Sequence, residues 1–147
     1  MSIWYRNYAV ADLDKLCADT AVSYLDIRFA ELGEDFVSAS MPVDARTVQP
    51  MRVLHGGASC LLAETLGSVA SNLVINPDAF YAVGAEINAS HLRPATRGRV
   101  TGIARPIRLG SSQHVWDIRI ENEAGGLVCI ARLTNVVRRR RDSVERD

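Results

Sequence analysis

The alternation of apolar and polar residues along the chain predicts six β-strands. Two short runs, 25–29 and 36–41, alternate on either side of a Gly-Glu-Asp turn at 33–35. Four longer strand-like runs follow in the second half of the chain, at 81–92, 99–109, 114–121 and 127–137. A Glu-Ala-Gly-Gly sequence between the last two runs predicts a hairpin turn, so we expect antiparallel pairing there.

Two other segments follow helical spacing. Residues 12–19 predict a short helix, and its apolar face consists of Leu13, Leu16 and Cys17. A much longer helix begins at Gly56-Gly57 and ends at Asn76-Pro77. Its apolar residues spread around most of the circumference, which is typical of a buried helix.

This order of elements indicates an α+β fold. Two strands, one long helix and four further strands leave the sheet a single helix to bury, so it should curl around that helix as in the hotdog fold. Trp116, Ile118 and Ile120 share one face of their strand. With no repeat and no linker, we expect one domain over residues 1–137, followed by a disordered Arg-rich tail at 138–147.

Composition excludes several classes of function. The 147 residues carry 17 Lys and Arg and 17 Asp and Glu, so no global charge favours nucleic acid or an anionic membrane. The three cysteines lack C-x-x-C spacing and the three histidines are scattered, so we expect neither a disulfide framework nor a metal site. The chain shows neither an apolar run of transmembrane length nor a signal peptide, which favours a cytoplasmic protein.

The only charge cluster is the run Arg138 to Arg141 near the end of the chain. A solvated terminus explains it most simply. Contact with a phosphate-bearing ligand or another polyanion is the alternative.

Glu64 is the first candidate for a reactive residue. Apart from a neutral His55, it is the only charge between Arg52 and Asp78, and no Lys or Arg lies within helical reach of it. Burying an unpaired carboxylate is strongly unfavourable. Glu64 must therefore be paired, protonated or used.

The start of the long helix is the second candidate. Its first amides have no partner within the helix and lie at the positive end of the helix dipole. Gly56 and Gly57 carry no side chain that would block a carbonyl oxygen from these amides, and His55 and Gln49 are nearby polar groups that could orient an acyl group or a water. The alternative is that the glycines only allow tight packing.

Geometry separates the two candidates. Glu64 lies eight residues beyond Gly56, about 12 Å along the helix axis, so one carbonyl cannot contact both within the same helix. Two copies of the helix packed antiparallel about a two-fold axis would bring Gly56 of one subunit near Glu64 of the other. Ser68, four residues after Glu64, lies on the same face; it could hold a water or a carboxylate oxygen, or only permit close packing.

Two other nucleophiles are weaker candidates. Cys60 has no evident base beside it on the helix and fits better as a small buried hydrophobe. Ser59 lies in a Gly-Ala-Ser-Cys-Leu sequence, which lacks the final glycine of a G-x-S-x-G elbow.

Four segments resemble hotdog-fold acyl-CoA thioesterases of the glutamate type: Met41 to Pro50, Leu54 to Ser59, Leu62 to Ser68 and Glu86 to His91. This branch includes 4-hydroxybenzoyl-CoA thioesterases, 1,4-dihydroxy-2-naphthoyl-CoA hydrolases and the proofreading thioesterase of enterobactin synthesis. The likeness runs from about Ile3 to Val136.

The resemblance implies roles for individual residues. Glu64 would be the nucleophile or general base, the Gly56 amide would polarise the thioester carbonyl, His55 and Gln49 would orient it, and Ser68 would position the water. Gly84 matches a neighbouring pocket position. The segments that hold coenzyme A in the family match His91, Leu92, Arg93, Pro94, Arg108, Leu109, Gly110, Ser111, Ser112 and Gln113.

The resemblance also implies an acyl-CoA substrate, an aromatic acyl group, no separate cofactor and a dimer of dimers. Relatives tend to have Phe-Gly where Met51-Arg52 stands here, which bears on the shape of the acyl pocket. The alternatives are a thioesterase for aliphatic or carrier-protein-bound acyl groups, and a non-catalytic acyl-CoA-binding protein. A hydratase is less consistent with the sequence, because the Asp–His pair of hotdog hydratases is missing.

Overall fold

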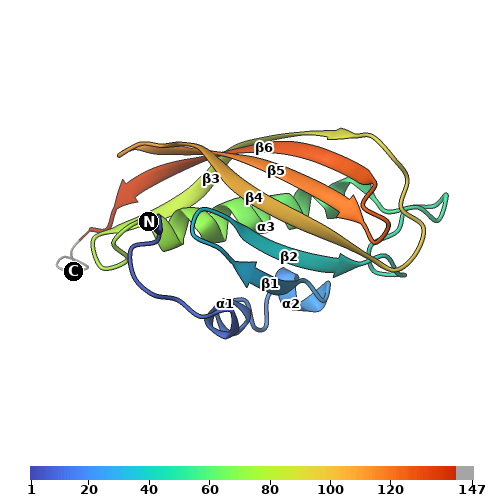
Figure 1. Ribbon diagram of the computed structural model, residues 1–147, viewed down its shortest axis with the longest axis horizontal. Helices are drawn as coiled ribbons and strands as arrows, with labels where there is room; N and C mark the ends of the chain where they lie inside the picture. The colour runs from blue at the N-terminus through green and yellow to red at the C-terminus, as the bar shows by residue number, and fades with distance from the viewer. Residues whose placement is uncertain (142–147) are drawn as a thin grey trace, which may run out of the picture.

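The computed structural model describes residues 1–141, which form a six-stranded antiparallel sheet and three helices (Figure 1). In chain order the elements are α1 (Val10–Leu16), α2 (Ala21–Tyr24), β1 (Arg28–Leu32), β2 (Val37–Pro42), α3 (Gly56–Val74), β3 (Phe80–His91), β4 (Arg99–Leu109), β5 (Gln113–Asn122) and β6 (Leu127–Arg139). The strand order across the sheet is β1-β2-β4-β5-β6-β3.

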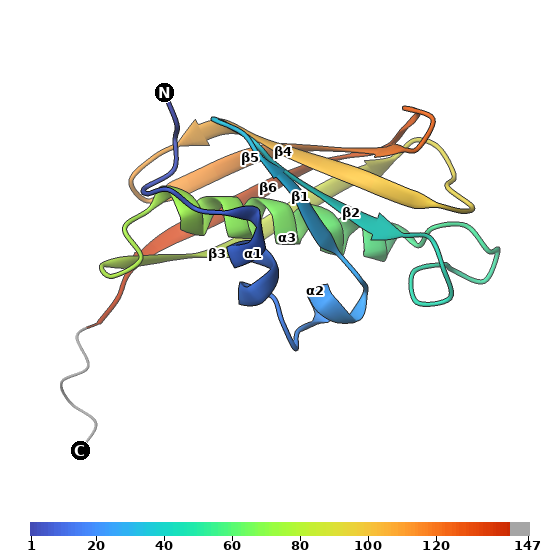
Figure 2. The ribbon, with the colours of Figure 1, turned by 60° about the horizontal axis from the view of Figure 1, so that its bottom comes forward.

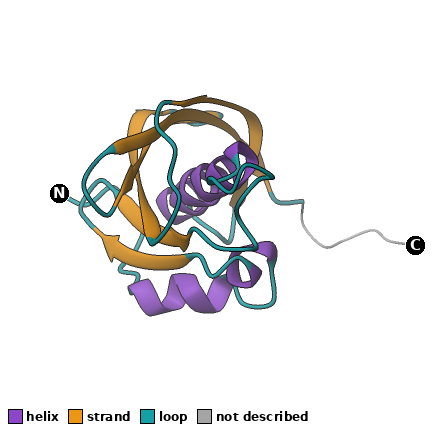
Figure 3. Ribbon diagram, turned by 90° about the vertical axis from the view of Figure 1, so that its right-hand side faces the viewer, coloured by secondary structure: helices purple, strands orange, loops and turns teal. Residues whose placement is uncertain are grey.

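The sheet curls around α3, as the view along that helix shows (Figure 3). Buried α3 residues such as Leu62, Leu66 and Ala70 pack against the concave face of the sheet. The short helices α1 and α2 lie outside this layer, beside β1 (Figure 2). The α+β hotdog architecture predicted from the order of elements is therefore confirmed.

The core has its centre between α3 and the middle strands. Trp116, Ile118 and Ile120 on β5 are fully buried, which confirms the predicted face of that strand. The Trp116 indole Nε1 donates a hydrogen bond to Ser71 Oγ at 2.8 Å, so the largest core side chain also ties α3 to the sheet. Gly102 on β4 allows close approach, since a methyl group there would lie 2.6 Å from a Leu66 side-chain carbon.

The N-terminal region differs from its prediction in three details. The first helix begins and ends earlier than expected, and Leu16 is 66% exposed while Leu13 and Cys17 are buried. Leu13 and Cys17 are four residues apart and share the face toward the core, whereas Leu16 falls on the solvent side. The single turn α2 was not predicted, because four residues are too few for a periodic signal. The first strand, β1, begins at Arg28 and not at residue 25 as predicted. It follows Asp26, whose φ of 54° lies in the left-handed region and is incompatible with a strand at that residue.

The predicted boundary at residue 137 falls inside β6. Arg138 and Arg139 pair with Tyr81 and Phe80 of β3, and the Arg140 amide donates to the Ala79 carbonyl at 2.8 Å. The expected disordered tail from 138 is therefore wrong for its first residues, which continue the ladder. Residues 142–147 lie outside the described part of the chain.

Strand β3 forms one edge of the sheet. It is twelve residues long and pairs with β6 on one side, while its other edge has no strand beside it within residues 1–141. The register of its ladder shifts between Gly84 and Glu86. A long open edge of this kind favours pairing with another strand.

The loop before α3 contains a residue in an unfavourable conformation. Arg52 is exposed and has a φ of 64°, in the left-handed region that disfavours residues with a Cβ. Its amide donates to the Gln49 carbonyl at 2.8 Å, and the Gln49 amide donates to the Val53 carbonyl at 2.9 Å. The tight turn that carries Gln49 therefore requires this backbone conformation.

We predict that Arg52→Gly raises the free energy of unfolding by about 1 kcal/mol, because glycine adopts a positive φ without a Cβ clash. Urea unfolding at a fixed protein concentration measures the change. Arg52→Ala is the matched control: it removes the guanidinium but keeps the Cβ, and it should bring no gain. Equal gains in both variants would contradict a backbone origin.

Candidate active site

The first turn of α3 presents one free amide. His55 is the N-cap, and its Nδ1 accepts a hydrogen bond from the Gly57 amide at 2.8 Å. The Gly56 amide donates to no acceptor within residues 1–141. Of the two glycine amides expected at the helix start, Gly56 alone is therefore open to a ligand, at the positive end of a 19-residue helix.

Hydrogen bonds hold the loop that precedes this turn. The His55 amide donates to the Thr47 carbonyl and the Leu54 amide to the Ala95 carbonyl, both at 2.8 Å. The Gln49 side-chain oxygen accepts from the Met51 amide. This leaves the Gln49 side-chain NH₂ as a free donor within the described residues.

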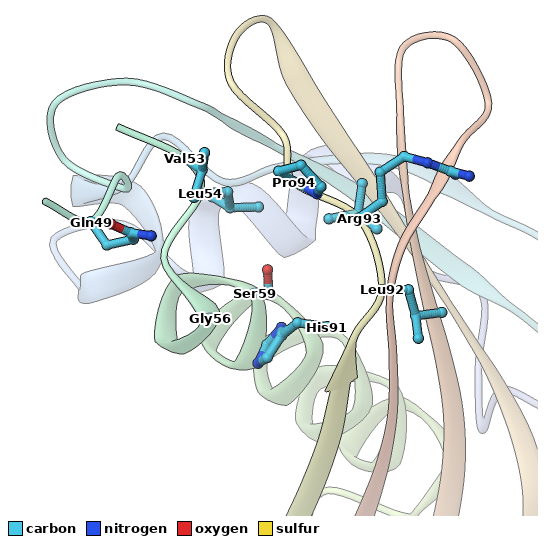
Figure 4. A pocket seen from close by; sticks show the side chains of 10 residues that line it. Gln49, Val53, Leu54, Gly56, Ser59, His91, Leu92, Arg93 and Pro94 are labelled. Atoms are coloured by element: carbon cyan, nitrogen blue, oxygen red, sulfur yellow. The ribbon is translucent and has the colours of Figure 1, made fainter. Parts of the chain in front are cut away.

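A pocket of about 330 Å³ opens in front of the helix start (Figure 4). Its lining brings together residues that are distant in sequence: Gln49, Val53, Leu54, Gly56, Ser59, His91, Leu92, Arg93, Pro94 and Val128. The structure thus places Gln49 and Gly56 in the same pocket as the whole segment 91–94. Most of its remaining lining is aliphatic.

His91 lies directly against the first turn of α3 (Figure 4). A methyl group on Gly56 would lie 2.7 Å from His91 Nε2, so the imidazole would have to turn away from any larger residue at this position. His91 comes from the end of β3, which runs alongside α3. Gly56 therefore allows the close approach of His91 to the helix start.

Glu64 lies two turns further along α3 and does not line this pocket. Its side chain is half-buried. Burial raises the pKa of Glu64, and hydrogen bonding with Ser68 partly opposes the rise. No charged side chain of residues 1–141 lowers the pKa of Glu64. Of the three possibilities drawn from the sequence, an ion pair within this part of the chain is therefore absent.

Gly84 makes room for the Glu64 carboxylate. A methyl group on Gly84 would overlap Glu64 Oε1. Gly84 lies on β3 immediately before its register shift. The edge strand therefore shapes the surroundings of the carboxylate.

The segment 108–113 lies elsewhere in the chain. It forms the turn between β4 and β5, which lies at the C-terminal end of α3, opposite the helix start (Figure 1). Leu109, Gly110 and Ser111 line a second pocket of about 280 Å³ together with Val74 and Phe80. Within one chain, this group and the segment 91–94 do not converge.

The remaining members of the segment have structural contacts. The Ser112 carbonyl accepts from the Val137 amide, and the Gln113 carbonyl accepts from the Gly110 amide, both at 2.9 Å. Arg108 adjoins a register shift between β4 and β5. None of these side chains lines the first pocket of the same chain.

The other nucleophiles are poorly placed. Burial raises the pKa of the Cys60 thiol, and the nearby Glu64 raises it further, so the reactive thiolate is disfavoured. Ser59 is buried and lines the first pocket, a position that its motif did not reveal. Across residues 1–141, His, Cys, Asp and Glu side chains nowhere gather in threes in a way that would hold a metal ion. No helix in this part of the chain is long and apolar enough to cross a membrane.

Asn135 was not among the residues predicted from the sequence. Its side chain is completely buried on β6 and donates hydrogen bonds to the Gly67 carbonyl and to Ser71 Oγ on α3. A signal existed, since Asn135 shares the two-residue period of Leu133 and Val137, which point into the molecule.

Comparison with known proteins identifies the family of this chain. Residues 51–129 match the model of the thioesterase superfamily. The chain is 47% identical to the 1,4-dihydroxy-2-naphthoyl-CoA hydrolase of Escherichia coli K12, over 92% of this chain and 98% of that protein. It is 44% identical to the proofreading thioesterase EntH of Cronobacter turicensis, again over 92% of this chain and 98% of that protein.

Solved structures agree as well. A crystal structure of a Q49A mutant of thioesterase PA1618 from Pseudomonas aeruginosa matches with a TM-score of 0.93 and 45% identity, covering 95% of this chain and all of the other. The match extends across the sheet, α3 and the loop before it. The chain therefore belongs to the thioesterase superfamily and is a thioester hydrolase of the hotdog fold.

Proposed function

We propose that this protein hydrolyses acyl-CoA thioesters, with aromatic acyl groups preferred, to the free acid and coenzyme A. The observation that carries the proposal is the free Gly56 amide in a pocket shared with Gln49 and the segment 91–94. An unpartnered amide at a helix start stabilises the negative charge that develops on an attacked carbonyl oxygen. Arg93 at the rim suits the phosphates of the coenzyme.

Two features support an aromatic acyl group. The E. coli relative, at 47% identity, is named a dihydroxynaphthoyl-CoA hydrolase. The pocket lining here includes the aliphatic side chains of Val53, Leu54, Leu92 and Val128, which suit a flat apolar ring.

The reaction would use Glu64 of a partner protomer. The thioester carbonyl oxygen accepts a hydrogen bond from the Gly56 amide, and Glu64 removes a proton from water as the water oxygen attacks the carbonyl carbon. The tetrahedral intermediate collapses, the carbon–sulfur bond breaks, and the coenzyme A thiolate takes the proton from Glu64. In the alternative route Glu64 attacks the carbon itself, and the carbon–sulfur bond breaks to release the coenzyme A thiolate. Water then hydrolyses the acyl-enzyme anhydride to the free acid and regenerates the Glu64 carboxylate.

A dimer is part of the proposal, because the helix holds the two groups too far apart. Eight residues of α3 separate Gly56 from Glu64, about 12 Å along the axis. The open edge of β3 and the half-buried face of α3 that carries Glu64 lie next to each other, and together they offer a surface for a second copy. An antiparallel, two-fold arrangement would build two identical sites.

His55 and Gln49 would orient the substrate. Since His55 Nδ1 accepts from the Gly57 amide, the neutral ring carries its proton on Nε2 and can donate from there. The free NH₂ of Gln49 is a second donor. Ser68, which hydrogen bonds with Glu64, would position the attacking water.

We predict that Glu64→Gln lowers kcat for benzoyl-CoA about 100-fold or more, because the general base is lost. Release of free thiol from a panel of aromatic and aliphatic acyl-CoA thioesters measures it and also ranks the acyl groups. Glu121→Gln is the matched control, since Glu121 is an exposed carboxylate on β5, away from the proposed interface, and it should keep near-normal rates. Near-normal hydrolysis by Glu64→Gln would contradict the assignment.

We also predict the pH dependence of kcat/KM. Glu64 acts only when ionised, and burial raises its pKa. The rate should therefore fall as pH falls through a pKa above the ordinary range of a glutamate. A pH profile of thiol release tests this; an acid limb at or below the usual glutamate range would contradict it.

A further inference from the structure

Asn135 joins the sheet to α3 close to the reactive carboxylate. It is fully buried, and its Nδ2 donates to the Gly67 carbonyl at 2.9 Å and to Ser71 Oγ at 2.7 Å. These two contacts fix the orientation of the carboxamide, because an oxygen facing the Gly67 carbonyl would place two acceptors against each other. The Asn135 oxygen therefore points away from Gly67.

That oxygen has no hydrogen-bond partner within residues 1–141, although it is shielded from solvent. Buried acceptors without a donor are unfavourable and rare in folded proteins. A donor is needed at this position.

Gly84 shows what lies beside the Asn135 oxygen. Gly84 is the β3 residue paired with Asn135. A methyl group on Gly84 would overlap Glu64 Oε1 and lie 3.7 Å from Asn135 Oδ1. The two oxygens thus flank the same glycine, at the place where the β3 ladder shifts register.

We propose that Asn135 is a positioning residue whose Oδ1 accepts a hydrogen bond from the protonated carboxyl group of Glu64. With Glu64 ionised, both oxygens beside Gly84 are acceptors, and no hydrogen bond can join them. When Glu64 gains a proton, its O–H can donate to Asn135 Oδ1, and the buried oxygen is satisfied. The inference rests on the proposed role of Glu64 as the general base. It adds a group that stabilises Glu64 in its protonated form.

The arrangement would favour the step in which Glu64 takes the proton of water. Glu64 must take up the proton of water on Oε1, the oxygen beside Gly84, for its O–H to donate to Asn135 Oδ1. The hydrogen bond to Asn135 forms only as that proton arrives, so it is stronger in the transition state than before it. It is released again when the proton passes to the departing thiolate. Asn135 touches no substrate and acts through Glu64.

Other groups around Glu64 do not supply this effect. On α3 the neighbouring titratable group is Cys60, whose thiol stays protonated. Cys129 on β6 has its pKa raised to about 11 by burial, so it is neutral as well. Glu86 on β3 is exposed. His114 on β5 is the buried residue paired with Asn135; burial lowers its pKa, and its Nδ1 has no partner within residues 1–141. His114 therefore makes no hydrogen bond to the Asn135 oxygen, and none of the other groups is a buried acceptor beside the carboxyl group.

The pH profile of kcat/KM tests the proposal, because two substitutions of Asn135 should shift its acid limb in opposite directions. Asn135→Leu removes the acceptor and should move the acid limb about 1 pH unit lower. Asn135→Asp places a second carboxylate there and should move it higher. Ser71→Ala disturbs the same network but keeps the Asn135 oxygen, and it should leave the limb in place. The proposal would be overturned if the acid limb stayed in place in both Asn135 variants, or if it moved by the same amount in the same direction in both.

A stability measurement tests the same contact without relying on activity. In Glu64→Gln the new NH₂ can donate to Asn135 Oδ1 permanently, so at pH 8 this variant should melt at least about 3 °C above the unmodified protein. In the Asn135→Leu background the gain should fall by half or more. Equal gains in both backgrounds would overturn the proposal, whether or not the protein hydrolyses thioesters.

Discussion

The rigidity of α3 is the constraint on which the site depends. A continuous helix from Gly56 to Val74 fixes its open first amide and its single carboxylate about 12 Å apart, on a rod that the sheet surrounds on most sides. No rotamer change closes that gap. In the proposed mechanism the helix supplies both halves of the thioester-cleaving site but cannot join them by itself, so a second copy of the chain would take part in the chemistry.

Burial also affects the two polar groups of α3 on which the proposed chemistry depends, the Gly56 amide and the Glu64 carboxylate. The sheet excludes water from much of α3, which strengthens the dipole at the Gly56 amide and raises the pKa of Glu64. The glycines provide space at both places, Gly56 for the close approach of His91 and Gly84 for the carboxylate itself. The open edge of β3 keeps this region accessible to a partner. Gly56 and Gly84 thus allow close packing at the two places where the proposed chemistry takes place.

The sequence predicted the elements with long, clear periods and failed where local patterns were short. The limits of α3 followed from Gly56-Gly57 and Asn76-Pro77, and the buried face of β5 from strict alternation. The one-turn helix α2 carried no such signal, and Leu16 was misplaced because a short helix has few turns to define its face. The grouping of Gln49 and Gly56 with segment 91–94 came from a family resemblance, since no spacing argument joins a loop to a distant strand end.

Other features of the site depended on three-dimensional contacts. The capping of Gly57 by His55, which leaves Gly56 as the open amide, requires a side-chain rotamer that sequence does not specify. Asn135 lay on an inward-pointing period, but its unpaired oxygen appears only once β3, β6 and α3 are packed. The relation between Gly56 and Glu64 is the reverse case, because simple helix geometry already predicts from the sequence that a site using both residues is shared by two protomers.

The most direct test of the shared site is complementation between two inactive variants. Co-expressed Glu64→Gln and Gly56→Val chains form mixed dimers, in which one site carries both changes and the other carries neither. If the site spans two protomers, each variant alone should be inactive and the equal mixture should recover about a quarter of the normal kcat, because half the dimers are mixed and each has one intact site. A mixture no more active than its parents would show that the site lies within one chain, and would contradict the account.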